Sequence, residues 1–192
     1  MSGTGSSDRL AGTSGERPVV LCCALGECSL GTVLAARTER GLRALWLGDD
    51  PDATREALRA RWPRVELVME PEPQGRALMA RLLVALERPA QAPQQLADLP
   101  VDVPGTALQQ RVWQALRALP PGAPVSYAEL ARRLGVPRAV RAVAGAIAAN
   151  PLAVMVPCHR VVRGDGSLAG FRWGIERKRE LLRREALAVR RA

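Results

Sequence analysis

The residues of this sequence best suited to chemistry are Cys158 and His159, in the stretch Val156-Pro157-Cys158-His159-Arg160-Val161-Val162. His159 is the only histidine of the 192 residues and follows one of four cysteines. A cysteine attacks as its thiolate, and a neighbouring imidazole lowers the thiol pKa. Because successive side chains of a strand diverge, we expect a water or a third residue to relay the proton between them. The alternative is a buried structural cysteine, since free cysteine is among the most buried residue types.

The composition is that of a globular protein with one ordinary domain or two small ones. Apolar residues make up 47% of the chain, enough for a hydrophobic core. The cysteines show no disulfide framework, and we find neither a leader pattern nor a long apolar run, so we expect a cytoplasmic, reduced protein without a membrane segment. Cys22, Cys23 and Cys28 lack the spacing of a zinc site, so we expect no metal and no cofactor.

Positive charge is concentrated in the second half of the sequence. Residues 101–192 contain 16 Lys/Arg and 6 Asp/Glu, a net charge of +10, whereas residues 1–100 contain 12 and 13, a net charge of −1. A basic half beside a neutral half predicts a polyanionic partner such as DNA. The alternative is a solvated basic surface, and because 27 of the 28 basic residues are arginine, codon bias is a further explanation.

Residues 18–98 are predicted to form an N-terminal α/β domain with a small antiparallel sheet. Residues 1–17 are rich in Gly, Ser and Thr and are predicted to be a disordered tail. The expected strands and helices, read from apolar runs, periodicity and turn signals, are strands 19–24, 32–36, 42–47 and 65–69, and helices 51–61 and 75–87, with Leu78, Leu82 and Leu86 on one stripe of the second helix. Residues 88–98 are rich in Pro, Gln and Ala and are predicted to be a linker.

Residues 99–187 are predicted to form a mainly helical domain, followed by a tail at 188–192. Thr106 and Ser126 each begin a capping box and therefore a helix. Pro137 is well placed to begin a third helix that reaches Asn150. Two short helices joined by a turn at Gly135 are typical of a helix-turn-helix, although this geometry also occurs in proteins that do not bind DNA.

One face of this third helix has the composition of a nucleic-acid surface. Its apolar positions are Val140, Val143, Ala144 and Ile147, which we expect to be buried. Its expected exposed residues are Arg138, Ala139, Arg141, Ala142, Gly145 and Ala149. Arginines among very small residues allow the helix backbone to approach a groove while guanidinium groups reach phosphates or the base stack. The alternative is an alanine-rich helix packed in the protein.

Several of these motifs occur in the order and spacing of one family. The sequence resembles the O6-alkylguanine-DNA alkyltransferases, close to the C-terminal part of bacterial Ada proteins, from residue 18 to residue 185 and most strongly from residue 106 onward. The motifs that carry the resemblance are Pro157-Cys158-His159-Arg160-Val161, Asn150-Pro151, Arg141 in Arg-Ala-Val-Ala-Gly, Ser-Tyr-Ala-Glu-Leu-Ala at 126–131, and Gly170-Phe171-Arg172-Trp173-Gly174. The resemblance implies a ribonuclease-H-like N-terminal domain without a catalytic role.

The resemblance also implies the chemistry and its catalytic residues. An alkyl group moves irreversibly from O6 of guanine, or O4 of thymine, to Cys158, and each molecule reacts once. His159 acts as a base through a water and is oriented by Glu185. Asn150 braces the site loop near the sulfur, and Tyr127 donates a proton to the departing guanine.

The resemblance further implies how a monomer engages double-stranded DNA containing O6-alkylguanine. The damaged base leaves the duplex, and Arg141, on a helix in the minor groove, fills the gap. The backbone carbonyls of Cys158 and Val161 read the guanine amino edge, and residues 164–173 cover the base. Phe171 stands where many members have tyrosine, and Arg172 also varies, so the alkyl-size preference stays open.

Three other functions are compatible with parts of the sequence. A non-catalytic member would recognise alkylated DNA and recruit repair factors, but such members replace the nucleophile that Cys158 retains. A full Ada-type regulator would need an N-terminal four-cysteine zinc module, and only three cysteines lie outside the motif. A cysteine hydrolase is the remaining enzymatic alternative.

Overall fold

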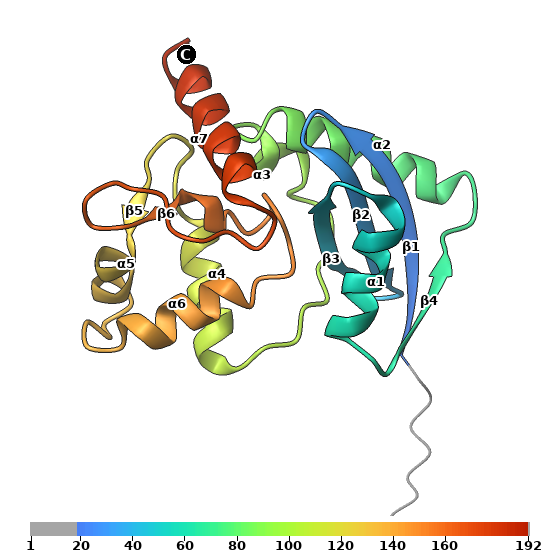
Figure 1. The fold of residues 1–192 in the computed structure, drawn as a ribbon, viewed down its shortest axis with the longest axis horizontal. Helices are drawn as coiled ribbons and strands as arrows, with labels where there is room; N and C mark the ends of the chain where they lie inside the picture. The colour runs from blue at the N-terminus through green and yellow to red at the C-terminus, as the bar shows by residue number, and fades with distance from the viewer. Residues whose placement is uncertain (1–18, 192) are drawn as a thin grey trace, which may run out of the picture.

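The computed structural model describes residues 19–191 as a mixed α/β fold with a small sheet and helices on either side of a shared core. In Figure 1 the sheet and helices α1 and α2 form the right half of the molecule, while α4, α5 and α6 form the left half, with α7 at its top. The predicted tail at 1–17 lies outside the described residues.

The sheet contains four strands in the order β3-β2-β1-β4. The strands are β1 Val19–Cys28, β2 Gly31–Thr38, β3 Gly41–Gly48 and β4 Val65–Met69. The first three strands pair antiparallel, as expected, but β4 pairs parallel with β1, so the prediction of a purely antiparallel sheet was wrong. The reason is the crossover through α1, which returns the chain to the far edge in the same direction as β1.

Three helices belong to this half: α1 Pro51–Arg61, α2 Gln74–Glu87 and the short α3 Ala92–Gln95. The Asp50 side chain accepts a hydrogen bond from the Ala53 amide and caps α1. Of the expected stripe on α2, Leu82 and Leu86 are buried and Leu78 is half-buried, while Met79 is also buried.

The predicted linker 88–98 is a packed part of the structure. It contains α3, and both Ala92 and Leu96 are buried in the core. Its Pro, Gln and Ala content favoured a linker, but Ala92 and Leu96 meet a surface that only the folded chain provides.

The outer edge of β3 joins the two halves of the molecule. Leu42 forms a parallel bridge with Val101, and Leu45 forms one with Leu152. The Leu45 amide donates to the Pro151 carbonyl, and the Ala153 amide donates back to Leu45. The sheet edge therefore holds the segment that precedes the Cys158 motif.

The second half contains four helices, two short strands and one 3-10 turn. They are α4 Ala107–Arg117, β5 Val125–Ser126, α5 Tyr127–Arg133, α6 Val140–Ala148, η1 Cys158–Arg160, β6 Val161–Val162 and α7 Ile175–Val189. Thr106 forms the reciprocal capping box with Gln109, as predicted. Ser126 caps α5, but the side chain of Glu129 pairs with Arg132 and Arg133 instead of completing a capping box.

The third helix is shorter than predicted, because α6 begins at Val140 instead of Pro137 and ends before Asn150. After Gly135, at a φ of 73°, the Ala139 amide donates to the Val136 carbonyl and closes a turn that contains Pro137. α7 continues to Val189 and so enters the stretch predicted as a tail.

Two features are absent from the residues that the structure describes. No helix within residues 19–191 has the length and apolar character needed to cross a membrane. Across the same described residues, no three His, Cys, Asp or Glu side chains are grouped so as to hold a metal ion.

We predict that Thr106→Ala lowers the free energy of unfolding by about 1 kcal/mol, because the Gln109 amide loses its capping oxygen. Urea denaturation checks this value. Thr106→Ser is the matched control and should retain most of the stability, since it keeps the hydroxyl. Equal losses in both variants would contradict a capping role for Thr106.

Candidate active site

Cys158 begins a single 3-10 turn, Cys158–Arg160, instead of lying in the strand expected for this stretch. The turn is closed by the Val161 amide, which donates to the Cys158 carbonyl, and β6 follows directly. β6 pairs parallel with β5, so Val125 is the partner of Val161. Because α5 starts immediately after β5, this pairing brings Tyr127 into the same site as Cys158.

Cys158 opens into a cavity of about 470 Å³. Three segments far apart in the sequence form its walls: the start of α5, the end of α6 and the segment before α7. The lining residues are Tyr127, Ala144, Ile147, Ala148, Asn150, Cys158, Gly170, Phe171, Arg172 and Trp173. The Cys158 side chain is largely buried, with 7% of the residue exposed. The volume falls within the range of small-ligand sites, so the cavity has room for an organic ring beside the sulfur.

Asn150 holds the loop between α6 and Cys158 with all of its amide atoms. Its Nδ2 donates to the carbonyls of Leu152 and Val156 and to the sulfur of Cys158, at 3.2, 2.8 and 3.2 Å, and its Oδ1 accepts from the Leu152 amide. Within this loop Val154 has a φ of 64°, an unfavourable conformation for a β-branched residue. The Asn150 network stabilises that backbone and fixes the position of the sulfur.

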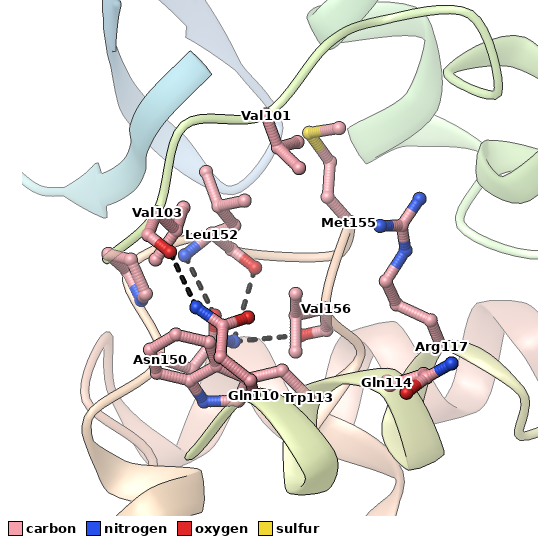
Figure 2. Close-up of a pocket in the computed structure, with 11 residues that line it drawn as sticks. Val101, Val103, Gln110, Trp113, Gln114, Arg117, Asn150, Leu152, Met155 and Val156 are labelled. Carbon is pink, nitrogen blue, oxygen red and sulfur yellow. Dashed lines mark hydrogen bonds between the residues drawn. The ribbon is translucent and has the colours of Figure 1, made fainter. Parts of the chain in front are cut away.

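Asn150 also lines a second cavity of about 540 Å³, which Figure 2 shows between α4, the 101–103 segment and the loop. Trp113 lines this cavity, and its indole Nε1 donates to the Ala146 carbonyl of α6. α4 therefore packs against α6 and, on the side of this second cavity, against the Asn150 loop.

Beneath the turn lies a fully buried cluster of His159, Arg160 and Glu185. His159 Nε2 lies 2.9 Å from Glu185 Oε1, and the Arg160 guanidinium donates to both Glu185 oxygens. The Gly122 amide adds a further hydrogen bond to Glu185. Burial alone would raise the pKa of Glu185, but the hydrogen bonds from His159 and Arg160 lower the pKa to about 2.

This cluster determines which imidazole nitrogen of His159 carries a proton. Since Glu185 is a carboxylate, it accepts, and Nε2 must donate. Burial lowers the pKa of His159, against the effect of Glu185, so the ring is neutral near neutral pH. Nδ1 is then an acceptor, and within residues 19–191 this buried atom has no hydrogen-bond partner. A proton acceptor therefore stands beside Cys158, with no direct bond to the sulfur, as the sequence predicted.

Burial controls the state of the Cys158 thiol. Desolvation raises the pKa of Cys158 to about 11, although the hydrogen bond from Asn150 and the positive charge of Lys178 act in the opposite direction. The thiol is therefore protonated in the free protein and must lose its proton as it reacts.

The remaining predicted substrate residues lie around the same cavity. Tyr127 is half-buried, and burial raises its pKa, so it retains its proton. Phe171 packs edge-on against Trp173, with the ring centroids 5.1 Å apart. The Arg172 guanidinium lies 5.5 Å from the Trp46 ring and donates to the Ala148 carbonyl, so it joins the sheet, α6 and the cavity wall.

The predicted DNA-contacting residues remain at the surface, but their placement differs in part. Arg141, Ala142 and Gly145 are exposed on α6, whereas Arg138 and Ala139 lie in the preceding turn, and Ala139 is half-buried. Of the expected buried face, Val143 and Ile147 are buried. Val140 and Ala144 are half-buried instead, and Ala146 is buried, because Ala144 faces the cavity while Ala146 packs toward α4.

Two residues of the site were given no role in the sequence analysis: Arg160 and Lys178. Arg160 lies within the cysteine motif, and the structure buries it against Glu185. The Val161 carbonyl, expected to read a base edge, accepts a hydrogen bond from Lys178 Nζ at 2.5 Å. Lys178 is the only lysine in a chain with 27 arginines, which is a signal the sequence contained.

Comparison with known proteins gives one consistent result. A family model described as 6-O-methylguanine DNA methyltransferase, DNA binding domain, matches residues 107–187. The bifunctional transcriptional activator/DNA repair enzyme Ada of Escherichia coli is 48% identical over 163 residues, which cover 85% of this chain and 45% of Ada. The chain therefore spans less than half the length of this relative.

Two solved structures are similar to this one over most of the chain. The crystal structure of Mycobacterium tuberculosis O6-methylguanine methyltransferase superimposes with a TM-score of 0.66 at 32% identity, covering 87% of this chain and 93% of that protein. A crystal structure of Mycobacterium tuberculosis OGT in complex with DNA has a TM-score of 0.66 at 31% identity, covering 86% and 92%.

We predict that Cys158 of the free protein reacts with iodoacetamide slowly at neutral pH and about tenfold faster per pH unit up to about pH 10. The reason is that only the thiolate reacts, and the pKa of Cys158 is raised to about 11. Quantitative mass spectrometry of the Cys158 peptide gives the rate. A rate that levels off near neutral pH would mean that the thiolate already exists in the resting protein.

Proposed function

The chain belongs to the 6-O-methylguanine DNA methyltransferase family, and we propose that it repairs DNA by moving an alkyl group from O6 of guanine to Cys158. O4-alkylthymine is a further substrate under the same chemistry. The observation that carries this proposal is a single cavity that holds the Cys158 sulfur and is walled on one side by α6, the helix that bears Arg141. Arg141 is exposed one helical turn before Ala144, which lines the cavity.

The transfer is one displacement step at the alkyl carbon. The Cys158 sulfur forms a bond to that carbon as the carbon–O6 bond breaks, and the electron pair of the broken bond passes to the guanine. The thiol proton goes through a water to Nδ1 of His159, whose charge Glu185 stabilises. The guanine anion takes a proton from Tyr127 as it leaves. The product thioether is not a leaving group under ordinary conditions, so each protein molecule reacts once.

A duplex must deliver its base to this cavity, because O6 is hidden in the base stack. We propose that α5 and α6 act as a helix-turn-helix with α6 in the minor groove and that Arg141 occupies the gap left by the extruded base. The exposed Ala142 and Gly145 support this role, since small side chains allow close approach to the sugar-phosphate backbone. Arg138 and Ala139 would contact DNA from the turn before the helix.

The finer architecture belongs to the same proposal. Residues 18–98 would form a ribonuclease-H-like domain that supports the site without reacting, and residues 99–187 the domain that binds DNA and carries Cys158. Absence of a metal or cofactor requirement, a cytoplasmic location and a monomeric state remain predictions from the sequence.

The alternative, non-catalytic recognition of alkylated DNA, is less well supported. Such a protein needs the base pocket and the basic helix but has no use for a nucleophile. Here Cys158 receives a hydrogen bond from Asn150 and lies next to a histidine–carboxylate pair. These contacts favour a reacting sulfur.

We predict that the protein, mixed with excess oligonucleotide duplex containing O6-methylguanine, gains the mass of one methyl group and then stops. Intact-mass spectrometry measures the change, and peptide mapping locates it on Cys158. Cys158→Ser should gain nothing, while Cys22→Ser, at a half-buried strand position, should behave like the parent protein. Release of free methylated product over several turnovers would rule out the mechanism.

We predict that Arg141→Ala slows methyl transfer from duplex DNA on the order of 100-fold, because filling the vacated stack offsets a few kcal/mol of unstacking. Transfer from a single-stranded oligonucleotide should fall much less, since the base is already accessible. Single-turnover rates on both substrates test this difference. Arg179→Ala, an exposed arginine of α7, is the matched control and should leave both rates unchanged.

A further inference from the structure

The Arg177 guanidinium, at the start of α7, connects the wall of the alkyl cavity to the sheet half of the molecule, which comprises β1–β4 and α1–α3. Its Nη1 donates to the carbonyl of Trp173, a residue of that wall, at 2.8 Å. Its Nε donates to the Leu30 carbonyl at 2.6 Å, and its Nη2 donates to the Gly48 carbonyl at 2.7 Å. Leu30 lies in the turn between β1 and β2, and Gly48 is the last residue of β3. One side chain therefore joins three segments that are far apart in the sequence.

The carbonyls hold Arg177 in place more than its neighbouring carboxylate does. The Arg177 side chain is only 16% exposed, whereas the Asp49 side chain that pairs with Nη2 is 94% exposed. Solvent screens an ion pair with so exposed a partner, so this pair adds little to the link. Hydrogen bonds from a charged donor to partly buried carbonyls are stronger. The link therefore depends on the guanidinium and its three carbonyls, and not on Asp49.

The turn between β1 and β2 leaves room for this guanidinium. Gly31 has a φ of 98°, a left-handed conformation that favours glycine. A Cβ at residue 31 would lie 2.9 Å from Arg177 Nη2 and 2.5 Å from the Gly48 carbonyl oxygen, which is too close for either contact. The planar guanidinium directs its donors toward separate acceptors, whereas a lysine has a single nitrogen. The sheet half is therefore shaped to receive an arginine at residue 177.

The segment that Arg177 holds helps to bury Cys158. Residues 170–173 line the cavity that contains the sulfur. Cys158 is 7% exposed, and this burial is the main cause of its raised pKa. Phe171 packs edge-on against the buried Trp173, so a shift of the Trp173 backbone would move both rings of the wall. A wall displaced outward would admit water to the sulfur and would hold a bound base less firmly.

We propose that Arg177 is a positioning residue of the alkyl-transfer site, through which the sheet half holds residues 170–173 in place around Cys158. Arg177 does not itself line the cavity, so it acts through Trp173 and the residues before it. Its effect on transfer rests on the proposed function, whereas its hold on the wall can be tested without DNA. The sheet half, expected to have no catalytic role, thereby gains a specific part in the reaction.

The first experiment measures single-turnover methyl transfer by Arg177→Met, which keeps an unbranched side chain but has no donors. Its maximal rate should fall about tenfold, because even a small misplacement of a bound substrate slows a reaction strongly. The DNA concentration at half-maximal rate should stay unchanged, since α6 and Arg141 are not altered. The loss should be equal on duplex and single-stranded DNA, unlike that of Arg141→Ala. Arg179→Met, an exposed neighbour on α7, should match the parent protein.

The second experiment tests the wall without DNA. Cys158 of Arg177→Met should react with iodoacetamide about tenfold faster than in the parent protein at the same pH, the result of lowering the thiol pKa by about one unit when water enters. Amide hydrogen exchange of residues 170–173 should also become faster. Thr106→Ala is the control for a general loss of stability, because its cap belongs to α4, and it should match the parent protein in both measurements.

The third experiment uses the unaltered protein, so it stands even where Arg177→Met does not fold. NMR measures the exchange of arginine Nε protons with water. The Arg177 Nε proton is bonded to the Leu30 carbonyl, whereas the Arg179 side chain is mostly exposed. The Arg177 proton should therefore exchange at least about tenfold more slowly than that of Arg179.

The outcomes separate the two proposals. If the protein takes no methyl group from DNA but Arg177→Met speeds both the labelling of Cys158 and exchange at residues 170–173, the proposed function fails and the hold of Arg177 on the wall stands. If transfer occurs but Arg177→Met matches the parent protein in transfer and labelling, the inference about Arg177 is overturned. Labelling of Thr106→Ala as fast as that of Arg177→Met, or equal exchange of the Arg177 and Arg179 Nε protons, would overturn it as well.

Discussion

The Glu185 carboxylate is the interaction on which the site depends. One buried anion accepts hydrogen bonds from the Arg160 guanidinium, the His159 ring and the Gly122 amide. These donors come from the turn after Cys158 and from the segment that leads to β5, while Glu185 itself lies on α7. Such a carboxylate is stable only when every partner is present, because burying an unpaired charge costs several kcal/mol. The same interaction therefore assembles three segments and fixes the proton of His159 on Nε2.

α7 carries a second group of contacts that reach the other half of the molecule. Arg177 donates to the carbonyls of Leu30 and Gly48 in the sheet half and to Trp173 at the end of the cavity wall. Arg172 extends from that wall over the ring of Trp46 on β3. The sheet half therefore does more than cover the core, since it holds the wall of the cavity through Arg172 and Arg177 and the Asn150 loop through the edge of β3.

The site combines a desolvated thiol with polar groups that are already in place around it. Burial keeps Cys158 protonated, so the resting sulfur is a weak nucleophile. Asn150, the His159 ring and the Lys178 ammonium are already in place, so the thiolate needs little rearrangement when it forms. A multiple-turnover enzyme would also need a route to remove the alkyl group, and in the described chain no second cysteine lies in this cavity.

Local patterns in the sequence were sufficient for much of the fold. Alternating and periodic apolar residues identified each strand of the sheet and the helices α1, α2 and α4, and the Thr106 capping box was confirmed at its residue. The motif around Cys158, which contains the only histidine of the chain, predicted a cysteine and a histidine in one site without a direct hydrogen bond between them. These features depend on neighbours within a few positions along the chain, so the sequence carries them directly. The mixed α/β class followed from the same patterns.

Only the tertiary structure decided the contacts between distant segments. The parallel pairing of β4, the burial of α3, the late start of α6 and the 3-10 turn at Cys158 each depend on what the folded chain packs against them. The burial of charged side chains was also decided only by the tertiary structure. Arg160 and Lys178 are buried, and their spacing in the sequence does not distinguish them from the many exposed arginines of this basic half. Burial is a property of the whole fold, and here burial turns ordinary charged residues into the groups that control one cysteine.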